Sequence, residues 1–276
     1  MRKLSFNKKL FLSAAGLVAG LLAVMALLSA LGATAQQLQF EVASVKPADP
    51  NAIGPVSYRT PQISGDRVRG RSITLPDLIL YAYNLRVFQM VGDTRLPSQP
   101  NKFDIDAKVE GSHSEDDVRL MFQSLLRDRF SLKTHWETKM LDGYRLTVAK
   151  GGAKLKPVSP HGIARMQYKN FPVREGKLQW MVAGDGAHLM SNAAPIRELI
   201  SRLIFILNAP VVDETGLRGT YDYAFDFTPD DFSPEMETDS PTLASALKKA
   251  TGLTLEKAKL PVQILVVEHV EKPTPN

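Results

Sequence analysis

The chain has 276 residues and no cysteine, with 34 basic against 29 acidic residues and a net charge of +5 at pH 7. Four basic residues and no acidic ones fall in the first 35 positions, so 30 basic residues face 29 acidic residues in the remainder. A nearly neutral remainder argues against nucleic acid as a partner. The lack of cysteine excludes thiol catalysis, zinc–thiolate sites and iron–sulfur clusters.

The first 35 residues have the pattern of a targeting segment. Four basic residues precede an uncharged run from position 10 to position 35, and Ala33-Thr34-Ala35 is a small-x-small cleavage signal. The run is also long enough to cross a bilayer, which takes ~20 apolar residues. We expect export with cleavage before Gln36, and the alternative is an uncleaved anchor in the inner membrane. Both put the remainder outside the cytoplasm, periplasmic or secreted, with membrane contact only through this segment.

Three arginines, Arg67, Arg69 and Arg71, alternate with Val68 and Gly70. Period-two alternation is typical of a half-buried strand, so the three guanidinium groups should share one face. Such a row can bind a carboxylate, a phosphate or an acidic glycan. The alternative is a solvated outer face, because surface strands often carry such charges.

The apolar pattern then predicts a helix, a strand and a second helix. A helical stripe begins at Leu75, with Pro76 in the first turn, where a proline costs little. A strand follows from 103 to 109, and Ser114 can cap the next helix. That helix has an apolar stripe at i, i+3, i+4, i+7 and i+8. The stripe consists of Val118, Met121, Phe122, Leu125 and Leu126.

Strand-like alternation resumes from 130 to 137 and again from 144 to 148. Asp142-Gly143 lies between the two runs. Asp-Gly is a strong turn pair, because glycine tolerates positive φ and aspartate can bond its own backbone. The sequence therefore predicts a hairpin of two strands at this point.

The same order of elements returns in the second half of the chain. A helical stripe starts after Pro195, a strand runs from 221 to 227, a helix lies around 243–250, and strands begin near Leu253 and Val262. Helix, strand, helix, strand, strand thus occurs twice, which indicates an internal repeat. We expect an α+β fold made by tandem duplication, with small, mainly antiparallel sheets covered by amphipathic helices. The two units are residues 36–156 and 157–276.

The histidines give only weak metal candidates, and nothing in the chain calls for a cofactor. Three of them begin an H-x-E pair, and positions i and i+2 share one face of a strand. A zinc site needs three or four ligands, and the sequence identifies no third, so exposed polar faces are the simpler interpretation. The pairs are His113/Glu115, His135/Glu137 and His269/Glu271, of which the last two are the metal candidates.

No known catalytic motif is present, since the chain lacks both a G-x-S-x-G elbow and an H-E-x-x-H sequence. Four aspartates, Asp104, Asp106, Asp222 and Asp226, offer carboxylates of the kind used in glycoside hydrolysis. They fall on the outward faces of their predicted strands, which is a sufficient structural reason for them.

Several motifs carry a family resemblance over nearly the whole chain after the targeting segment. They are FEVASVKP at 40–47, LLRDRF at 125–130, ETK at 137–139, YRLTVAK at 144–150, PVVD at 210–213, YD at 221–222 and VEHVEKP at 267–273. Together they resemble an uncharacterised "soil-associated" bacterial protein family, a domain of unknown function. The resemblance implies an exported protein, and in some relatives a similar domain is fused to an antirepressor-type membrane sensor peptidase. It implies no catalytic residues, and the chain has no peptidase segment.

We therefore expect an exported, non-catalytic module that binds or senses outside the cytoplasm, with Arg67, Arg69 and Arg71 as its ligand-binding residues. Its partner would be an envelope protein, a peptide or a glycan. An envelope hydrolase built from scattered His, Asp and Glu is one alternative, and a structural envelope protein is another.

Overall fold

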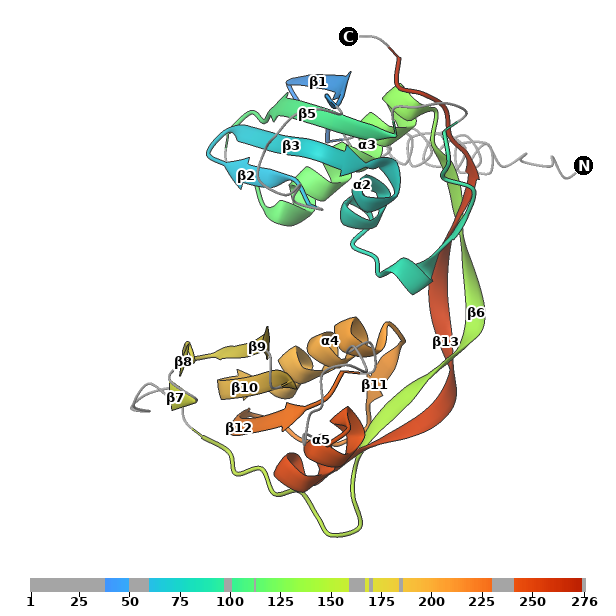
Figure 1. Cartoon of the computed structure of the whole chain (residues 1–276). Helices are drawn as coiled ribbons and strands as arrows, with labels where there is room; N and C mark the ends of the chain where they lie inside the picture. Colours follow the sequence, from blue (N-terminus) through green and yellow to red (C-terminus); the bar gives the residue numbers. More distant parts are fainter. Residues whose placement is uncertain are drawn as a thin grey trace, which may run out of the picture.

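Two lobes are joined by a ribbon of two long strands in the computed structural model (Figure 1). The structure describes residues 38–49, 60–96, 101–111, 113–158, 167–168, 171–183, 186–229 and 241–274. The ribbon strands are β6 (Lys133–Val148) and β13 (Leu253–His269). They pair antiparallel along their length, from Leu253 opposite Val148 to His269 opposite Lys133. Each lobe therefore contains one end of β6 and one end of β13.

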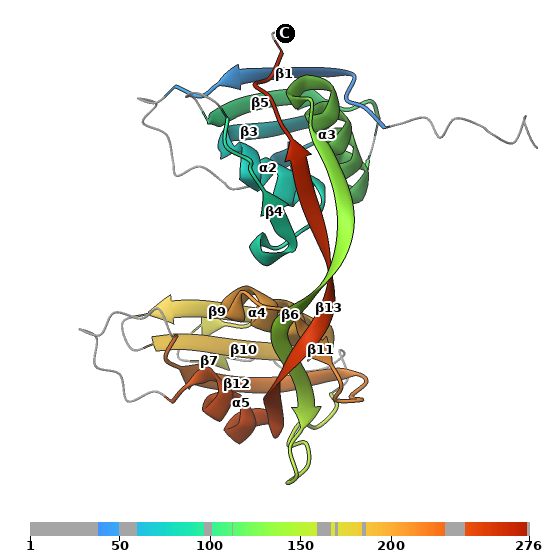
Figure 2. The same ribbon diagram turned by 90° about the vertical axis from the view of Figure 1, so that its right-hand side faces the viewer.

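The first lobe is a four-stranded antiparallel sheet with two helices on one face (Figure 2). The strand order is β1-β5-β3-β2. The bounds are β1 (Val42–Pro47), β2 (Gln62–Ser64), β3 (Arg67–Thr74), β5 (Lys102–Lys108), α2 (Leu75–Ala82) and α3 (Glu115–Phe130). A 3₁₀ turn, η1 (Val87–Gln89), leads into the short strand β4 (Met90–Gly92).

The predicted helix after Ser114 is confirmed. The Ser114 hydroxyl accepts from the Asp117 N–H at 3.1 Å, and the Ser114 N–H donates to the Asp117 carboxylate at 3.0 Å. This capping box satisfies donors that a helix start would otherwise leave unpaired. All five residues of the predicted apolar stripe are buried against the sheet, so the stripe fixes which face of α3 points inward.

The second lobe has a three-stranded antiparallel sheet in the order β12-β10-β9, together with two helices. The bounds are β9 (Lys177–Ala183), β10 (Gly186–Pro195), β12 (Thr220–Phe227), α4 (Ile196–Leu207) and α5 (Leu243–Thr251). A two-stranded ladder, β7 (Gln167–Tyr168) and β8 (Phe171–Pro172), precedes them. The fold is thus α+β, with four α-helices and mostly antiparallel sheets in the described part of the chain.

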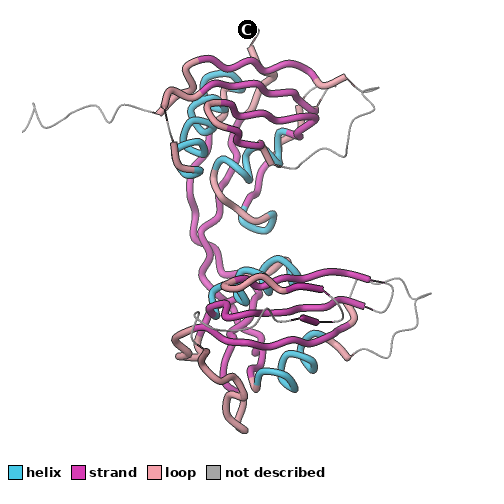
Figure 3. The backbone as a smooth tube through the Cα atoms, turned by 90° about the vertical axis from the view of Figure 1, so that its left-hand side faces the viewer, coloured by secondary structure: helices cyan, strands magenta, loops and turns pink. Residues whose placement is uncertain are grey.

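A third sheet, in the order β11-β6-β13-β4, is built on the ribbon itself. The short strands lie parallel to it, β4 beside β13 in the first lobe and β11 (Val211–Asp213) beside β6 in the second. Between the lobes, the two long strands run alone and twist about each other (Figure 3).

The two lobes share one plan, in which a strand enters a helix directly, a short strand joins the ribbon, and a second strand leads to a second helix. Ser72 in β3 and Ala193 in β10 both have φ 52° at a break in register. Their N–H groups donate to Asp104 at 2.8 Å and Asp222 at 2.7 Å, respectively. The irregularity of the strand is therefore the same in both lobes.

The ribbon contacts repeat as well. Met90 of β4 lies opposite Leu265, and Val211 of β11 lies opposite Tyr144. One and the same sequence spacing separates Met90 from Val211, Tyr144 from Leu265, and the two bulge residues from each other.

The predicted hairpin at Asp142-Gly143 is wrong, because both residues lie inside the continuous strand β6. The two strands expected from Leu253 and Val262 are likewise one strand, β13. A Cβ on Gly143 would stand 2.5 Å from the Pro210 carbonyl oxygen and 3.0 Å from Leu260 Cδ1. Glycine is therefore needed here for the close approach of another chain segment and not for a turn. In each predicted unit, the last two strands are therefore the two ends of one long strand, β6 or β13. One end lies in the first lobe and the other end lies in the second lobe.

We predict that Gly143→Ala destabilises the protein by ~1–3 kcal/mol, the usual cost of overpacking. The matched control is Gly151→Ala, since a Cβ there meets nothing within 4 Å. Denaturant unfolding of the two variants measures the difference. Equal stabilities of the Gly143→Ala and Gly151→Ala variants would contradict the close approach of Pro210 to Gly143.

Candidate functional site

The three arginines of β3 lie on the sheet face opposite α2 and α3. Val68, between the first two, is 0% exposed and packs in the core, so the pleat turns its neighbours outward. The side chains of Arg67, Arg69 and Arg71 are 50%, 56% and 55% exposed. The predicted row on one strand face is therefore present, and we call these three residues the arginine row.

One carboxylate holds the arginine row together. Asp106 of β5 lies opposite Arg69 in register. Its Oδ1 is 3.1 Å from Arg67 Nη1, and its Oδ2 is 3.6 Å from Arg69 Nε and 3.9 Å from Arg71 Nη2. Three guanidinium groups thus share a single negative charge, which leaves a net charge of about +2 on this group at neutral pH.

Two neighbouring charged side chains have partners of their own. The Asp104 carboxylate accepts the bulge N–H of Ser72, and Lys108 forms its own ion pair with Glu41 at 2.8 Å. The bond to Glu41 raises the pKa of Lys108 above its ordinary value. Arg71 Nη1 also donates to the Ile105 carbonyl at 3.4 Å, which tethers that guanidinium to the sheet. The face is therefore a fixed, positively charged surface.

The metal candidate His135/Glu137 lies on the ribbon, where the structure adds a third side chain. His135 Nδ1 is 2.6 Å from Glu268 Oε1, and His135 Nε2 is 3.0 Å from Glu137 Oε1. Hydrogen bonds to Glu137 and Glu268 raise the pKa of His135, and the bond to His135 lowers the pKa of Glu137. Both ring nitrogens face carboxylates, an arrangement that suits an imidazolium better than a metal ligand. Among the residues that the structure describes, no group of three or more His, Asp or Glu is placed to hold a metal ion.

In one of the other two H-x-E pairs the two residues contact each other, and in the second pair they do not. His269 Nε2 is 2.9 Å from Glu271 Oε1, and Ser131 also donates to that glutamate at 3.1 Å. The bond to His269 lowers the pKa of Glu271. Glu115 pairs with Arg119 at 2.6 Å, whereas His113 bonds the Glu110 carbonyl at 2.5 Å. These contacts tie helix and strand ends together.

The four aspartates considered for glycoside hydrolysis all have structural partners. Asp104 and Asp222 accept the two bulge N–H groups, and Asp106 holds the arginine row. Asp226 accepts at 2.7 Å from His188, whose side chain is only 3% exposed. That buried His–Asp pair was not predicted, because His188 belongs to no motif. The carboxylates are spread over two lobes, so they form no common hydrolytic centre.

A family model described as "Protein of unknown function (DUF3738)" matches residues 76–270. No curated protein and no solved structure matches the chain. Within the described residues, none of the helices is both long and apolar enough to cross a membrane.

We predict that His135 titrates above its ordinary value of about 6.5, and that the E137Q/E268Q variant moves the midpoint back toward that value. Because the pKa of His135 is higher in the folded state than in the unfolded state, the contacts of its charged ring stabilise the protein fully below pH 6.5. This stabilisation is lost as the pH rises through the folded-state pKa of His135. NMR titration of the His135 ring protons measures both midpoints. Equal midpoints in the two proteins would contradict the assignment of the carboxylate contacts.

Proposed function

The chain belongs to the DUF3738 family of proteins of unknown function, and we propose that it is an exported, non-catalytic module that binds an acidic glycan on the arginine row. Export is supported by the basic and apolar pattern of residues 1–35, a segment that lies outside the described residues. The resemblance to a soil-associated family, with relatives fused to membrane sensor peptidases, is consistent with binding or sensing outside the cytoplasm.

The observation that carries the proposal is the sharing of one carboxylate by three guanidinium groups on one strand. Residues i and i+2 are about 6.6–6.8 Å apart along the backbone of a strand, and the three long side chains converge on Asp106. Because Asp106 neutralises only one of the three charges, the row can still attract further carboxylates of an acidic polymer. Each guanidinium can hold a carboxylate through two parallel hydrogen bonds.

We also propose that the two lobes arose by duplication of a unit corresponding to residues 36–156 and 157–276. The equal bulges at Ser72 and Ala193 and the equal registers of β4 and β11 support this origin. The lobes do not coincide with these units, because β6 and β13 each run through both lobes.

We predict that the full-length chain binds polygalacturonate but not neutral dextran, and that R67Q/R69Q/R71Q weakens this binding about tenfold or more. Exposed ion pairs contribute up to about 1 kcal/mol each, and 1.4 kcal/mol corresponds to a tenfold change in affinity. Isothermal titration calorimetry at fixed salt measures the affinities.

The matched control is K248Q/K249Q/K257Q, which removes three exposed basic residues from the second lobe and the ribbon. Both triple variants change the net charge equally. If they weaken binding by the same factor, only net charge matters and the arginine row is not the site. Hydrolysis of the polymer by the wild-type chain would favour the hydrolase, and no binding at all would favour a structural role.

For localisation, we expect the chain in the periplasmic or secreted fraction, with a mature N-terminus at Gln36. Fractionation followed by N-terminal sequencing checks both points. An intact N-terminus in the inner-membrane fraction would indicate the anchor instead, and recovery in the cytoplasm would contradict export.

A further inference from the structure

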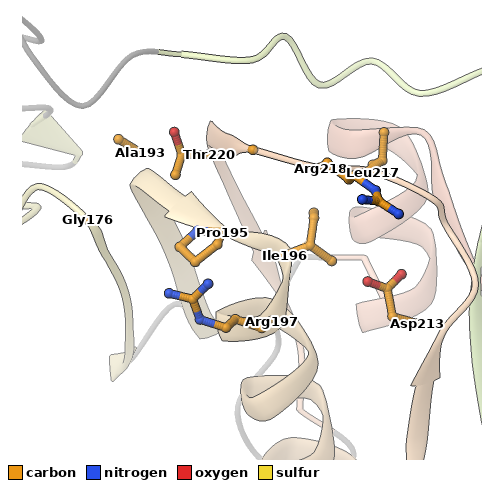
Figure 4. A pocket seen from close by; sticks show the side chains of 10 residues that line it. Gly176, Ala193, Pro195, Ile196, Arg197, Asp213, Leu217, Arg218 and Thr220 are labelled. Carbon is orange, nitrogen blue, oxygen red and sulfur yellow. The ribbon is translucent and has the colours of Figure 1, made fainter.

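A cavity of about 560 Å³ opens in the second lobe where β10 passes into α4 (Figure 4). Its wall comes from the Ala193–Arg197 junction, from Asp213 at the end of β11, and from the loop of residues 217–220. Pockets for small molecules usually enclose about 300–1,000 Å³, so the size suits a small ligand. The cavity lies in the lobe that does not contain the arginine row.

Two arginines from separate elements enter this cavity. Arg197 belongs to the first turn of α4 and Arg218 to the loop before β12, and Figure 4 shows their guanidinium groups on either side of Ile196. Neither has a carboxylate within ion-pair distance in the described part of the chain, in contrast to the arginine row with Asp106. Ile196 is 4% exposed and, with Leu217, gives the cavity an apolar wall between the two charges.

Internal hydrogen bonds fix the loop that carries Arg218. The buried Tyr221 donates its hydroxyl to the Arg218 carbonyl at 2.7 Å, and the Thr220 hydroxyl donates to the Val158 carbonyl at 2.6 Å. On the other side, the Leu217 N–H donates to Thr215, whose hydroxyl donates to Asp213 at 2.7 Å. The loop is thus ordered before a ligand arrives, which lowers the entropic cost of binding.

The start of α2 in the first lobe corresponds to the start of α4, but it has a side-chain cap and no arginine. There, Thr74 precedes α2, accepts from the Asp77 N–H at 3.2 Å and donates to the Asp77 carboxylate at 2.8 Å. At the equivalent position of the second lobe stands Pro195, and α4 has no side-chain cap. Arg197 occupies the place of Pro76. The partial positive charge of the uncapped helix start adds to the two guanidinium groups, which remain the main attraction.

We propose that this cavity binds a small dicarboxylate, with one carboxylate at Arg197, the other at Arg218, and the apolar middle of the molecule against Ile196. The site is independent of the glycan-binding function proposed for the first lobe. Two guanidinium groups in one preformed cavity, neither paired with a carboxylate of the described residues, favour an anion with two acidic groups, because arginine matches the planar carboxylate with two hydrogen bonds.

The test uses the full-length chain and three probes, namely succinate, inorganic phosphate and the neutral succinamide. We expect saturable binding of succinate by calorimetry, a rise in melting temperature with succinate, and at least tenfold weaker binding in R197Q and in R218Q. Both side chains are exposed, so the variants should fold, and circular dichroism with the melting temperature without ligand checks this.

The matched control is R67Q/R69Q/R71Q, which should bind succinate as the wild type does. Equal affinity of the wild type for succinate and succinamide, a preference for phosphate, or unchanged succinate binding in R197Q and R218Q would each overturn the proposal. A wild-type chain that binds succinate but not polygalacturonate would overturn the first proposal alone, so the two failures are distinguishable.

Discussion

The antiparallel pairing of β6 with β13 is the constraint on which the rest of the structure depends. Leu265 and Val267, near the end of β13, are buried in the core of the first lobe. Leu146, near the end of β6, is buried in the core of the second lobe. Each core thus needs a strand end from the distant half of the chain. Pairing between residues so far apart in sequence must close a long loop, which makes folding slow compared with local structure.

A two-stranded ribbon alone is at best marginally stable in water. Here, β4 and β11 each add a short parallel strand to the ribbon where it enters a lobe, and the helices cover the apolar side chains at both ends. Gly143 makes the pairing of β11 with β6 possible. Because it has no Cβ, the chain at Pro210 can approach β6, and β11 begins at the next residue. The ribbon is therefore anchored at each end by the lobe that it helps to complete.

Local patterns were sufficient to predict the helices, the capping box at Ser114 and the outward row of arginines, since these follow from side-chain periodicity and nearest neighbours. They failed at Asp142-Gly143, where a good turn pair is overridden by pairing with β13. The partner of the arginine row could not be predicted, because the position of Asp106 opposite Arg69 depends on the β3–β5 register and on the bulge. The same applies to the contact of Glu268 with His135, which crosses the ribbon.

The shared plan of the lobes makes their differences informative. The positions of β10 equivalent to the arginine row are His188, Met190 and Asn192, and all three are buried. The outer face of the second sheet is therefore closed at the place where the first sheet presents its charges. Conversely, the helix start that Thr74 caps in the first lobe has no side-chain cap at Pro195, beside a cavity lined by Arg197 and Arg218. Pleat, bulge and helix register are kept while the exposed arginines lie at different places, so one scaffold presents a different charged surface in each lobe.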